Sequence, residues 1–489
     1  MKNRLSKCSN VGKLISLIGI LLMFPLLVLP FYPQDAIYAV SFLIPALLSV
    51  VLGLCICLLS KLGEKNMYMG DVVHRGNLTV LVAWGYGFIA GAIPFVLAKK
   101  LTFVQALFEA VSGWTTTGLS TMDVTVTPHI FLFHRSFMQF CGGLGFVMVM
   151  ILFVQGKQAM NLYNAEGHPD KIMPNLRETV RAIFAVYISC LLVGVIAYVL
   201  CGMPLFDSIL HTMGALSTGG FSNMADSIGA YHSIAIESVT VILMLIGTTN
   251  FALILLLVRR KWKQAFRAGE FRLLGVILLI FVPLTALSLM FKLYISFGEG
   301  FRQALFNIVS ALSTTGYSTM SYQGWPPFAL GIMILMMLIG GGIGSTAGGI
   351  KLSRVLILIK SALHNVKSHI APEHEVSTPF YYRAQGKTPI TDSVLKSTTG
   401  FVTCYLCIFI AGSLLLTVTA NVSLTDAMFE FASSLGTVGL SVGITGAGTN
   451  SATLIIEICG MILGRLEIFI VLTGIYSAVK VLFRSRKSI

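Results

Sequence analysis

Long apolar runs alternate with short polar segments along most of the chain. The runs that predict helices cover residues 14–31, 36–60, 77–98, 129–154, 180–201, 233–258, 272–295, 328–360, 395–419 and 452–482. A helix needs roughly 17–25 apolar residues to cross a bilayer core of about 30 Å, and each run meets this length. We therefore predict an all-α polytopic membrane protein with ten spanning helices embedded in a lipid bilayer.

Four intervals between these runs begin with an amphipathic segment that is too short to span the bilayer. They lie between helices three and four, five and six, seven and eight, and nine and ten, and each continues into a Gly/Thr/Ser cluster. Because a half-length segment must enter and leave on the same side, we predict four re-entrant pore loops. The chain then divides into two leading helices and four pseudo-symmetric helix/pore-loop/helix repeats around a central pore. The predicted boundaries are 1–72 for the leading helices, then 73–160, 161–262, 263–365 and 366–489 for the repeats.

The four clusters are TTTGLST, STGGFSN, STTGYST and TVGLSVG, and they align on one glycine each. These equivalent glycines are Gly118, Gly220, Gly316 and Gly439. Three of them lie ten residues after a phenylalanine, at Phe108, Phe306 and Phe429. In repeat two, Gly220 lies fourteen residues after Phe206, so this repeat is expected to be four residues longer. A fixed offset that recurs over most of a chain indicates internal repetition.

Extended Gly-rich backbone at membrane depth is tolerated only where protein or water surrounds it. Glycine allows neighbouring carbonyls to point the same way, and rings of carbonyl and hydroxyl oxygens replace the hydration shell of a monovalent cation. We therefore predict a cation filter, and the alternative is a set of small-residue packing motifs for tight helix crossings. The candidate filter residues are Thr116, Thr117, Gly118, Thr218, Gly219, Gly220, Thr314, Thr315, Gly316, Thr437, Val438 and Gly439.

Polar residues on the pore helices have two interpretations. Glu109, Asp207 and Glu430, placed near the helix starts, either complement a helix N-terminus or give the outer mouth a negative field. His211 is expected to pack rather than to bind a cation.

The eighth run is interrupted by LIGGGIGSTAGGIKLSR. Glycine inside a helix costs about 1 kcal/mol relative to alanine, so this stretch predicts a break just below the filter. A nucleotide-binding glycine loop is the alternative, but no strand precedes it and the Lys-Ser/Thr pair is absent. The residues of the interruption are Gly340, Gly341, Gly342, Gly344, Ser345, Thr346, Ala347, Gly348 and Gly349, with Lys351 at its inner edge.

Arg465 is a charged residue in the middle of the tenth run, with Glu467 two positions later. A charge at that depth costs several kcal/mol and is retained where it faces a cavity or a partner. A structural ion pair with Glu467 is the alternative, although residues two apart on a helix do not face each other.

Composition and charge exclude several other classes. Apolar residues make up 55% of the chain and charged residues 11%, far from a soluble domain. The net charge of +14 comes from bases spread among short loops, so we expect no nucleic acid partner. An intramembrane enzyme would need a catalytic constellation, and the sequence has no H-E-x-x-H, no Ser/His pair and no paired intramembrane carboxylates.

The distribution of bases predicts orientation. They fall on one side if ten helices span: Lys2, Arg4, Lys7 and Lys13, then Lys61, Lys65 and Arg75, then Lys157, Lys171, Arg177 and Arg181, then Arg259, Arg260, Lys261, Lys263 and Arg267, then Lys367, Arg383 and Lys387, and finally Arg484, Arg486 and Lys487. By the positive-inside rule that side is the cytoplasm. We therefore expect an integral protein of the cytoplasmic (inner) membrane, with both termini on the cytoplasmic side and the pore loops on the extracellular or periplasmic side.

These motifs resemble the Trk/Ktr/HKT superfamily of potassium transporters, most closely its TrkH-type potassium-uptake subunits. The resemblance rests on the two leading helices and on FEAVSGWTTTGLSTMD, MPLFDSILHTMGALSTGGFSNM, FNIVSALSTTGYSTM and GRLEIF at 464–469. The fourth filter, SSLGTVGLSVG, departs from the N-L-G-P-G-like sequence common in the TrkH type and is more similar to the Ktr type. A Ktr-type translocating subunit is therefore the alternative within the superfamily.

The resemblance implies several functional expectations. Four glycines imply potassium preference, because serine at the first position accompanies sodium permeation in the superfamily. The Gly340–Gly349 stretch and Lys351 correspond to an intramembrane gate, and Arg465 to a pore arginine that acts as a barrier or contacts the gate. A homodimer is expected, with a cytosolic TrkA/KtrA-like nucleotide-binding subunit docked on loops 259–272 and 361–394. Potassium is the transported ion, no organic cofactor is expected, and a sodium-permeable or ion-coupled symporter is the alternative.

Overall fold

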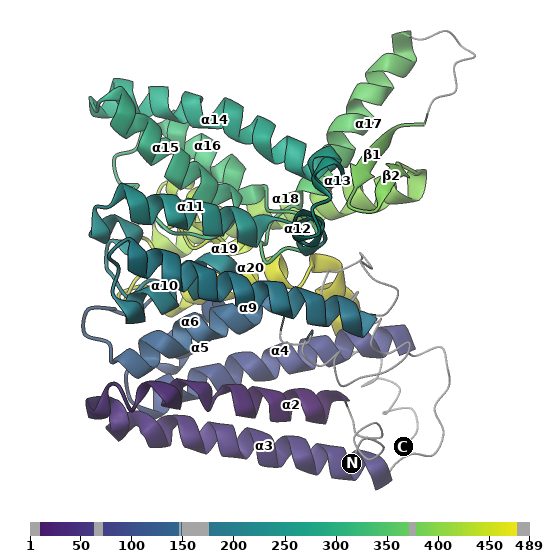
Figure 1. Cartoon of the computed structure of the whole chain (residues 1–489). Coiled ribbons are helices and arrows are strands. Elements are labelled where there is room, and N and C mark those ends of the chain that lie inside the picture. The colour runs from purple at the N-terminus through teal and green to yellow at the C-terminus, as the bar shows by residue number, and fades with distance from the viewer. Residues whose placement is uncertain (1–9, 63–71, 146–147, 149–175, 371–377, 477–489) are drawn as a thin grey trace.

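Two helices that pack closely along each other open the described part of the chain. In the computed structural model, which describes residues 10–62, 72–145, 148, 176–370 and 378–476, they are α2 (Asn10–Leu21) and α3 (Ala39–Leu62). Two 3-10 turns that begin with proline, η1 (Phe24–Val28) and η2 (Pro33–Tyr38), connect them (Figure 1). Glycines allow the close approach, because a methyl group at Gly12 would lie 2.7 Å from the carbonyl oxygen of Gly53.

The order of a long helix, a short helix, a loop and another helix then recurs four times. The first two groups are α4 (Val72–Leu97), α5 (Phe103–Trp114) and α6 (His129–Leu144), and then α9 (Leu176–Leu200), α10 (Leu205–Ser217), η4 (Ser227–Tyr231), α11 (Ile234–Thr248), α12 (Phe251–Val258) and α13 (Trp262–Arg267). The last two are α14 (Gly269–Leu293), α15 (Phe297–Leu312), α16 (Pro327–Leu338) and α17 (Leu352–Ile370), and then α18 (Asp392–Ala420), α19 (Leu424–Gly436) and α20 (Ser451–Arg465). The predicted repeat boundaries stay predictions.

A small antiparallel hairpin interrupts the otherwise helical order. β1 (Phe380–Arg383) pairs with β2 (Gly386–Pro389), with Tyr381 opposite Thr388. The fold is nevertheless mostly helical, as predicted. The hairpin lies in the interval 361–394, which the sequence predicts as a loop, and α17 extends ten residues beyond the predicted end at 360.

The long apolar helices begin and end within a few residues of their predicted positions. Within the described residues, six spans are long and apolar enough to cross a membrane: α2 with η1, η2 with α3, α4, α9, α14 and α18. The bent pair α11 and α12 would make a seventh. The predicted runs 129–154, 328–360 and 452–482 form shorter helices instead, and parts of the first and last lie outside the described residues.

Two helix breaks were not expected from the sequence. The predicted helix 233–258 bends by 110° between α11 and α12, where the side chain of Asn250 caps α12 by accepting from the N–H of Ala252. The predicted helix 452–482 stops at Arg465 and resumes at residue 468, with Glu467 at a positive φ of 57°. Besides the eighth run, two further predicted helices are therefore broken within the described residues.

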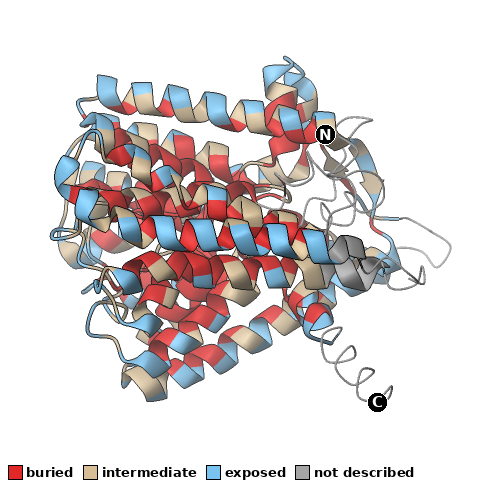
Figure 2. Cartoon of the chain, turned by 90° about the horizontal axis from the view of Figure 1, so that it is seen from below, coloured by how far each residue is buried: buried red, intermediate tan, exposed pale blue. Residues whose placement is uncertain are grey.

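The outer helices present apolar side chains outward. On α9, Leu192, Val193 and Ile196 are each about 60% exposed or more, whereas the centre of the bundle is buried (Figure 2). Exposed apolar residues in such numbers are stable only against lipid, because water penalises apolar surface. The chain is an integral membrane protein.

The basic tails used for the orientation argument, residues 1–9 and 477–489, lie outside the described residues, as do Lys65, Lys157 and Lys171. The orientation of the chain stays a prediction.

Candidate ion pore

Four short helices, α5, α10, α15 and α19, supply the predicted filter segments. They contain 12, 13, 16 and 13 residues, which at 1.5 Å per residue gives about 18–24 Å, less than a bilayer core. Helix α10 begins fifteen residues before its filter glycine, as α5 and α19 do. Repeat two is therefore not longer, and Leu210 occupies the position that Phe108 has in repeat one. The helix that starts early is α15.

Each of these helices ends in the same hydrogen-bonded turn. The N–H groups of Thr117, Gly219, Thr315 and Val438 donate to the carbonyl five residues earlier at 2.8–3.0 Å, and those of the preceding threonines donate three residues back at 3.1–3.2 Å. This pair of bonds is the Schellman motif, which requires a residue in the left-handed conformation after the helix. That residue is a threonine in all four segments: Thr116, Thr218, Thr314 and Thr437, with φ between 52° and 56°.

The filter glycines also have positive φ, between 73° and 97°. Left-handed residues therefore alternate with ordinary ones, at the threonine and at the glycine two positions later. Such angles are expected of glycine, yet here threonine adopts one of them at a strain of order 1–3 kcal/mol. The helix-closing bonds hold the threonine in this conformation.

The four glycine segments contact one another in a closed cycle. A methyl group added to Gly118 would overlap the carbonyl oxygen of Gly219, and one at Gly220 would overlap that of Thr315. One at Gly316 would overlap the carbonyl of Val438, and one at Gly439 that of Thr117. Each glycine thus rests on the next segment, and the fourth returns to the first. The structure brings all twelve predicted filter residues together.

A polar side chain stands nine residues before each glycine and bonds to the loop that follows it. Glu109 accepts from the N–H of Thr121 at 2.6 Å, and Glu430 accepts from the N–H of Val442 at 3.1 Å. His211 lies 3.0 Å from the hydroxyl of Ser222, which fits its predicted packing role, and Asn307 donates to the hydroxyl of Thr319. Glu109 and Glu430 lie near the middle of their helices, not at the starts, so of the three predicted acidic residues only Asp207 occupies a first turn. These side chains hold the filter loops from behind.

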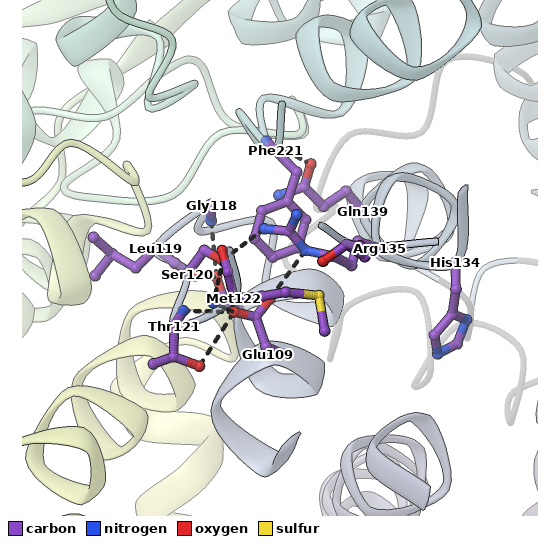
Figure 3. A network of polar contacts seen from close by, with 12 residues as sticks. Glu109, Gly118, Leu119, Ser120, Thr121, Met122, His134, Arg135, Gln139 and Phe221 are labelled. Carbon is purple, nitrogen blue, oxygen red and sulfur yellow. Dashed lines mark hydrogen bonds and ion pairs between the residues drawn. The ribbon is translucent and has the colours of Figure 1, made fainter. Parts of the chain in front are cut away.

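A buried ion pair reinforces the first segment. Arg135 on α6 lies 3.0 Å from Glu109, and the two side chains are 2% and 0% exposed (Figure 3). The guanidinium also donates to Ser120 and stacks 4.0 Å from the ring of Phe221 in repeat two. One turn later, Gln139 donates to the carbonyl of Gly219 and accepts from the N–H of Phe221. Helix α6 therefore ties repeat one to the filter of repeat two.

A cavity of about 620 Å³ lies against one face of the ring, and its lining includes all four filter glycines. We call it the vestibule. Asp123 and Asp226 line it, together with Arg135 and His232. The hydroxyl and N–H of Thr125 lower the pKa of Asp123, so this carboxylate stays charged at neutral pH. Acidic groups at a pore mouth raise the local concentration of cations.

The interrupted segment between α16 and α17 lies against the other face of the ring. Its ends are pinned together, since the N–H of Gly340 donates to Ile350 at 2.8 Å and the N–H of Ile350 donates to Leu338 at 2.9 Å. This break agrees with the prediction from the sequence.

The interrupted segment contacts the filter threonines directly. Thr346 bonds the hydroxyl of Thr218 at 3.1 Å, and the N–H of Gly348 donates to the hydroxyl of Thr314 at 2.9 Å. A methyl group at Gly348 would overlap the hydroxyl of Thr437. Three of the four left-handed threonines of the ring therefore face the segment.

The bend between α11 and α12 holds the segment from the side. The carbonyl of Thr248 accepts from Gly342 at 3.0 Å, and the N–H of Phe251 donates to Gly344 at 3.4 Å. Lys351 donates to the carbonyl of Ala347 within the segment, while Gly341, Ser345 and Gly349 complete the turn.

Arg465 joins the interrupted segment to repeat one. Its guanidinium donates to the carbonyls of Thr346 and Gly142 at 2.5 Å each, and to that of Gly143 at 3.1 Å. Glu467 pairs instead with Arg354 at 2.6 Å, which excludes the alternative ion pair within the tenth run. Arg465 is the last residue of α20 and contacts the interrupted segment, rather than lying in the middle of a helix.

Several contributors to the site were missed from the sequence. Arg135 and Gln139 are two polar residues one turn apart in FLFHRSFMQF, a stretch rich in phenylalanine, and this pattern indicates a face turned toward a polar partner. A polar residue stands nine positions before each of the four glycines, an offset more regular than that of phenylalanine, which holds in three repeats. The bend at Asn250 has a weaker signal, the polar triplet Thr-Thr-Asn within an apolar run.

The fold and the ring define a class, the membrane proteins that transport cations. The family model described as cation transport protein, TrkH, matches residues 53–478, and the chain belongs to this family. The chain is therefore a membrane cation transporter and not an enzyme.

Curated relatives cover most of the chain. The Trk system potassium uptake protein TrkH of Salmonella typhimurium is 32% identical over 418 residues, which is 82% of this chain and 85% of the relative. The Trk system potassium uptake protein TrkG of Escherichia coli is 30% identical over 482 residues, 94% of this chain and 95% of the relative. The crystal structure of the potassium transporter TrkH from Vibrio parahaemolyticus matches with a TM-score of 0.82 at 27% identity, over 96% of this chain and 98% of that chain.

Proposed function

We propose that this chain takes up potassium across the cytoplasmic membrane through the ring formed by its four glycine segments. The closed cycle of segments carries the proposal, because each one has the same alternation of left-handed residues and the same helix end. Such backbone turns carbonyl oxygens toward a common axis, and the threonine hydroxyls add a further ring. The relatives named for potassium uptake support the choice of ion.

The pore helices contribute electrostatically. All four end at the ring, so their C-terminal partial negative charges, about half an elementary charge each, are directed at the ion. A dehydrated cation at the ring is stabilised by these dipoles and by carbonyl oxygens that belong to a rigid backbone. Arg135 lies on the vestibule face, where Glu109 neutralises it.

The interrupted segment between α16 and α17 serves as the gate in this proposal. The hydroxyl of Thr218 donates to Thr346 and that of Thr314 accepts from the N–H of Gly348, so both hydroxyls are occupied where they would otherwise face an ion, which describes a closed pore. Arg465 holds the segment to repeat one and places a positive charge in the path of the cation. Opening requires the release of these bonds and movement of the segment against the bend at α11 and α12.

We also propose that a cytosolic nucleotide-binding subunit of the TrkA/KtrA type controls this gate and that the chain works as a homodimer. The two predicted docking loops support the first part, because they adjoin each other: Gln264 of α13 donates to the carbonyl of Ala384 in the hairpin at 2.8 Å (Figure 1). The bases Arg259, Arg260 and Lys263 beside them are exposed. Their joint reversal to glutamate should abolish co-purification with a co-expressed regulatory subunit, and retained binding would exclude this surface.

Ion flux in vesicles tests the central proposal. Purified protein in proteoliposomes should take up rubidium, a potassium analogue, much faster than sodium. Equal rates for the two ions would contradict potassium selectivity and favour the sodium-permeable alternative. Empty vesicles prepared in the same detergent provide the baseline.

A further inference from the structure

Two buried glutamates of repeat four meet through one threonine hydroxyl. Glu430 on α19 and Glu457 on α20 are both 0% exposed. The hydroxyl oxygen of Thr445 lies 2.5 Å from Oε1 of Glu430 and 2.9 Å from Oε1 of Glu457. Paired intramembrane carboxylates were not expected, because the two residues are 27 positions apart in the sequence, but the structure brings them together.

The single hydroxyl proton of Thr445 cannot form hydrogen bonds to two ionised carboxylates at once. A hydroxyl donates one hydrogen bond, so Thr445 can donate to only one of the two glutamates. The other short contact requires a carboxylic acid that donates its own proton to the threonine oxygen. One glutamate of the pair is therefore protonated.

The hydrogen bonds identify which glutamate is ionised. Glu430 also accepts from the hydroxyl of Ser441 at 2.7 Å and from the N–H groups of Val442 and Thr445, both at 3.1 Å. Several donors around one carboxylate stabilise its charged form. Glu457 has only the threonine contact, and its Oε2 has no hydrogen-bond partner among the described residues. The proton therefore resides mainly on Glu457.

Repeat one shows what the pair lacks. Glu109 stands nine residues before Gly118, as Glu430 does before Gly439. Arg135 follows Gly118 by 17 residues, and Glu457 follows Gly439 by 18. In repeat one the arginine neutralises the buried carboxylate at 3.0 Å. In repeat four a second acid occupies that place, and a buried pair of like charges is stable only when one of them is neutralised.

In the part of the chain that the structure describes, no cation from a neighbouring helix takes the place of the arginine. Helix α20 packs against α5, α18 and α19. On α5 the charged residue is Glu109, which is already paired with Arg135. On α19 the charged residues are Asp426 and Glu430. On α18 they are Asp392 and Lys396, which lie at the end of the helix opposite to the contact between Thr453 and Thr419. The remaining titratable groups of α18 and α20 are Cys404, Tyr405, Cys407 and Cys459, and the cation of α20 itself, Arg465, is bound at the interrupted segment.

We propose that Glu457, Thr445 and Glu430 form a proton-binding site that retains one proton behind the fourth filter segment. When the proton is bound, Glu457 donates a hydrogen bond to the hydroxyl of Thr445, and this hydroxyl donates to Glu430. Glu430 also accepts from Ser441 and Val442 and so fixes the loop after Gly439. Loss of the proton places two carboxylates against one hydroxyl, and their repulsion loosens this loop. The filter of repeat four is thereby sensitive to pH.

Infrared spectroscopy of the full-length protein in lipid tests the proton directly. A protonated carboxylic acid has a carbonyl stretching band that a carboxylate lacks. Wild-type protein at neutral pH should show this band, and Glu457→Gln should remove it, whereas Asp426→Asn on the same helix as Glu430 should retain it. Absence of the band from wild-type protein, or its full persistence in Glu457→Gln, overturns the proposal; a metal cation between two carboxylates would give the first of these results.

Ion flux supplies a second readout, which rests on the proposed function. Rubidium uptake by wild-type protein should fall as the pH is raised, and Glu457→Gln, whose amide imitates the protonated acid, should retain uptake that no longer depends on pH in that range. Parallel pH profiles for the two proteins would refute the link between the proton and the filter. The infrared result does not depend on transport, so failure of the proton site and failure of the transport proposal are distinguishable.

Discussion

Replacement of Gly118 by alanine tests the closed cycle of glycine segments. The φ of Gly118 is 97°, and an added methyl group would overlap the carbonyl oxygen of Gly219 and lie 3.3 Å from its carbon. A side chain at such a φ costs about 1–3 kcal/mol, and the overlap adds to this. Because the obstacle is backbone, relief requires movement of the Gly219 carbonyl. If distortion of the ring releases that strain of about 1–3 kcal/mol, the preference for rubidium over sodium should fall by roughly 5- to 150-fold, because about 1.4 kcal/mol corresponds to a factor of ten.

The measurement is the ratio of rubidium to sodium uptake in proteoliposomes. Gly331→Ala is the matched control, because Gly331 lies in helix α16 and an added methyl group there meets nothing within 4 Å. That variant should keep the wild-type ratio. A folded Gly118→Ala protein with an unchanged ratio would refute the assignment of this ring as the filter.

Three further changes address the gate and the support of the ring. Arg465→Ala removes the bonds to Thr346 and should raise rubidium leak under conditions that close the wild-type pore; loss of folded protein would indicate a purely structural role. Gly348→Ala forces a methyl group against a filter threonine and should also raise leak, whereas unchanged flux would contradict close contact between segment and ring. Arg135→Met leaves Glu109 buried without its cation and should destabilise the protein by about 3–5 kcal/mol. Thermal unfolding in detergent measures this loss, and adding Glu109→Gln to the same chain should restore part of it. Equal stability of the single and double variants would mean that the two side chains are not coupled.

The helical architecture was predictable because apolar length and periodicity act locally. Runs such as 395–419 and 180–201 correspond to α18 (Asp392–Ala420) and α9 (Leu176–Leu200), since lipid selects continuous apolar helices. The break between α16 and α17 was predictable for the opposite reason, because clustered glycines destabilise a helix wherever they occur. The filter positions could be aligned because Thr and Gly recur together, although their ion-binding role stays a prediction.

The remaining features depend on partners that are distant in the sequence. The bend at Asn250 exists because the backbone of Thr248 bonds to Gly342, almost a hundred residues later. Arg465 has its partners in carbonyls more than a hundred residues earlier, so no local pattern distinguishes it from an ion-paired arginine. The left-handed threonines were missed because propensity assigns such angles to glycine, whereas here the helix-closing hydrogen bonds impose them.

The closed cycle of glycine segments belongs to one polypeptide, and this has a genetic consequence. In a ring built from identical subunits, a single codon change alters every quarter at once, so most changes are severe. In this chain a change in one codon alters one of the four glycine segments and leaves the other three unchanged. Each position can therefore diverge separately, as Val438 has from Thr117 and Thr315, and a pore of this kind can be tuned in small steps.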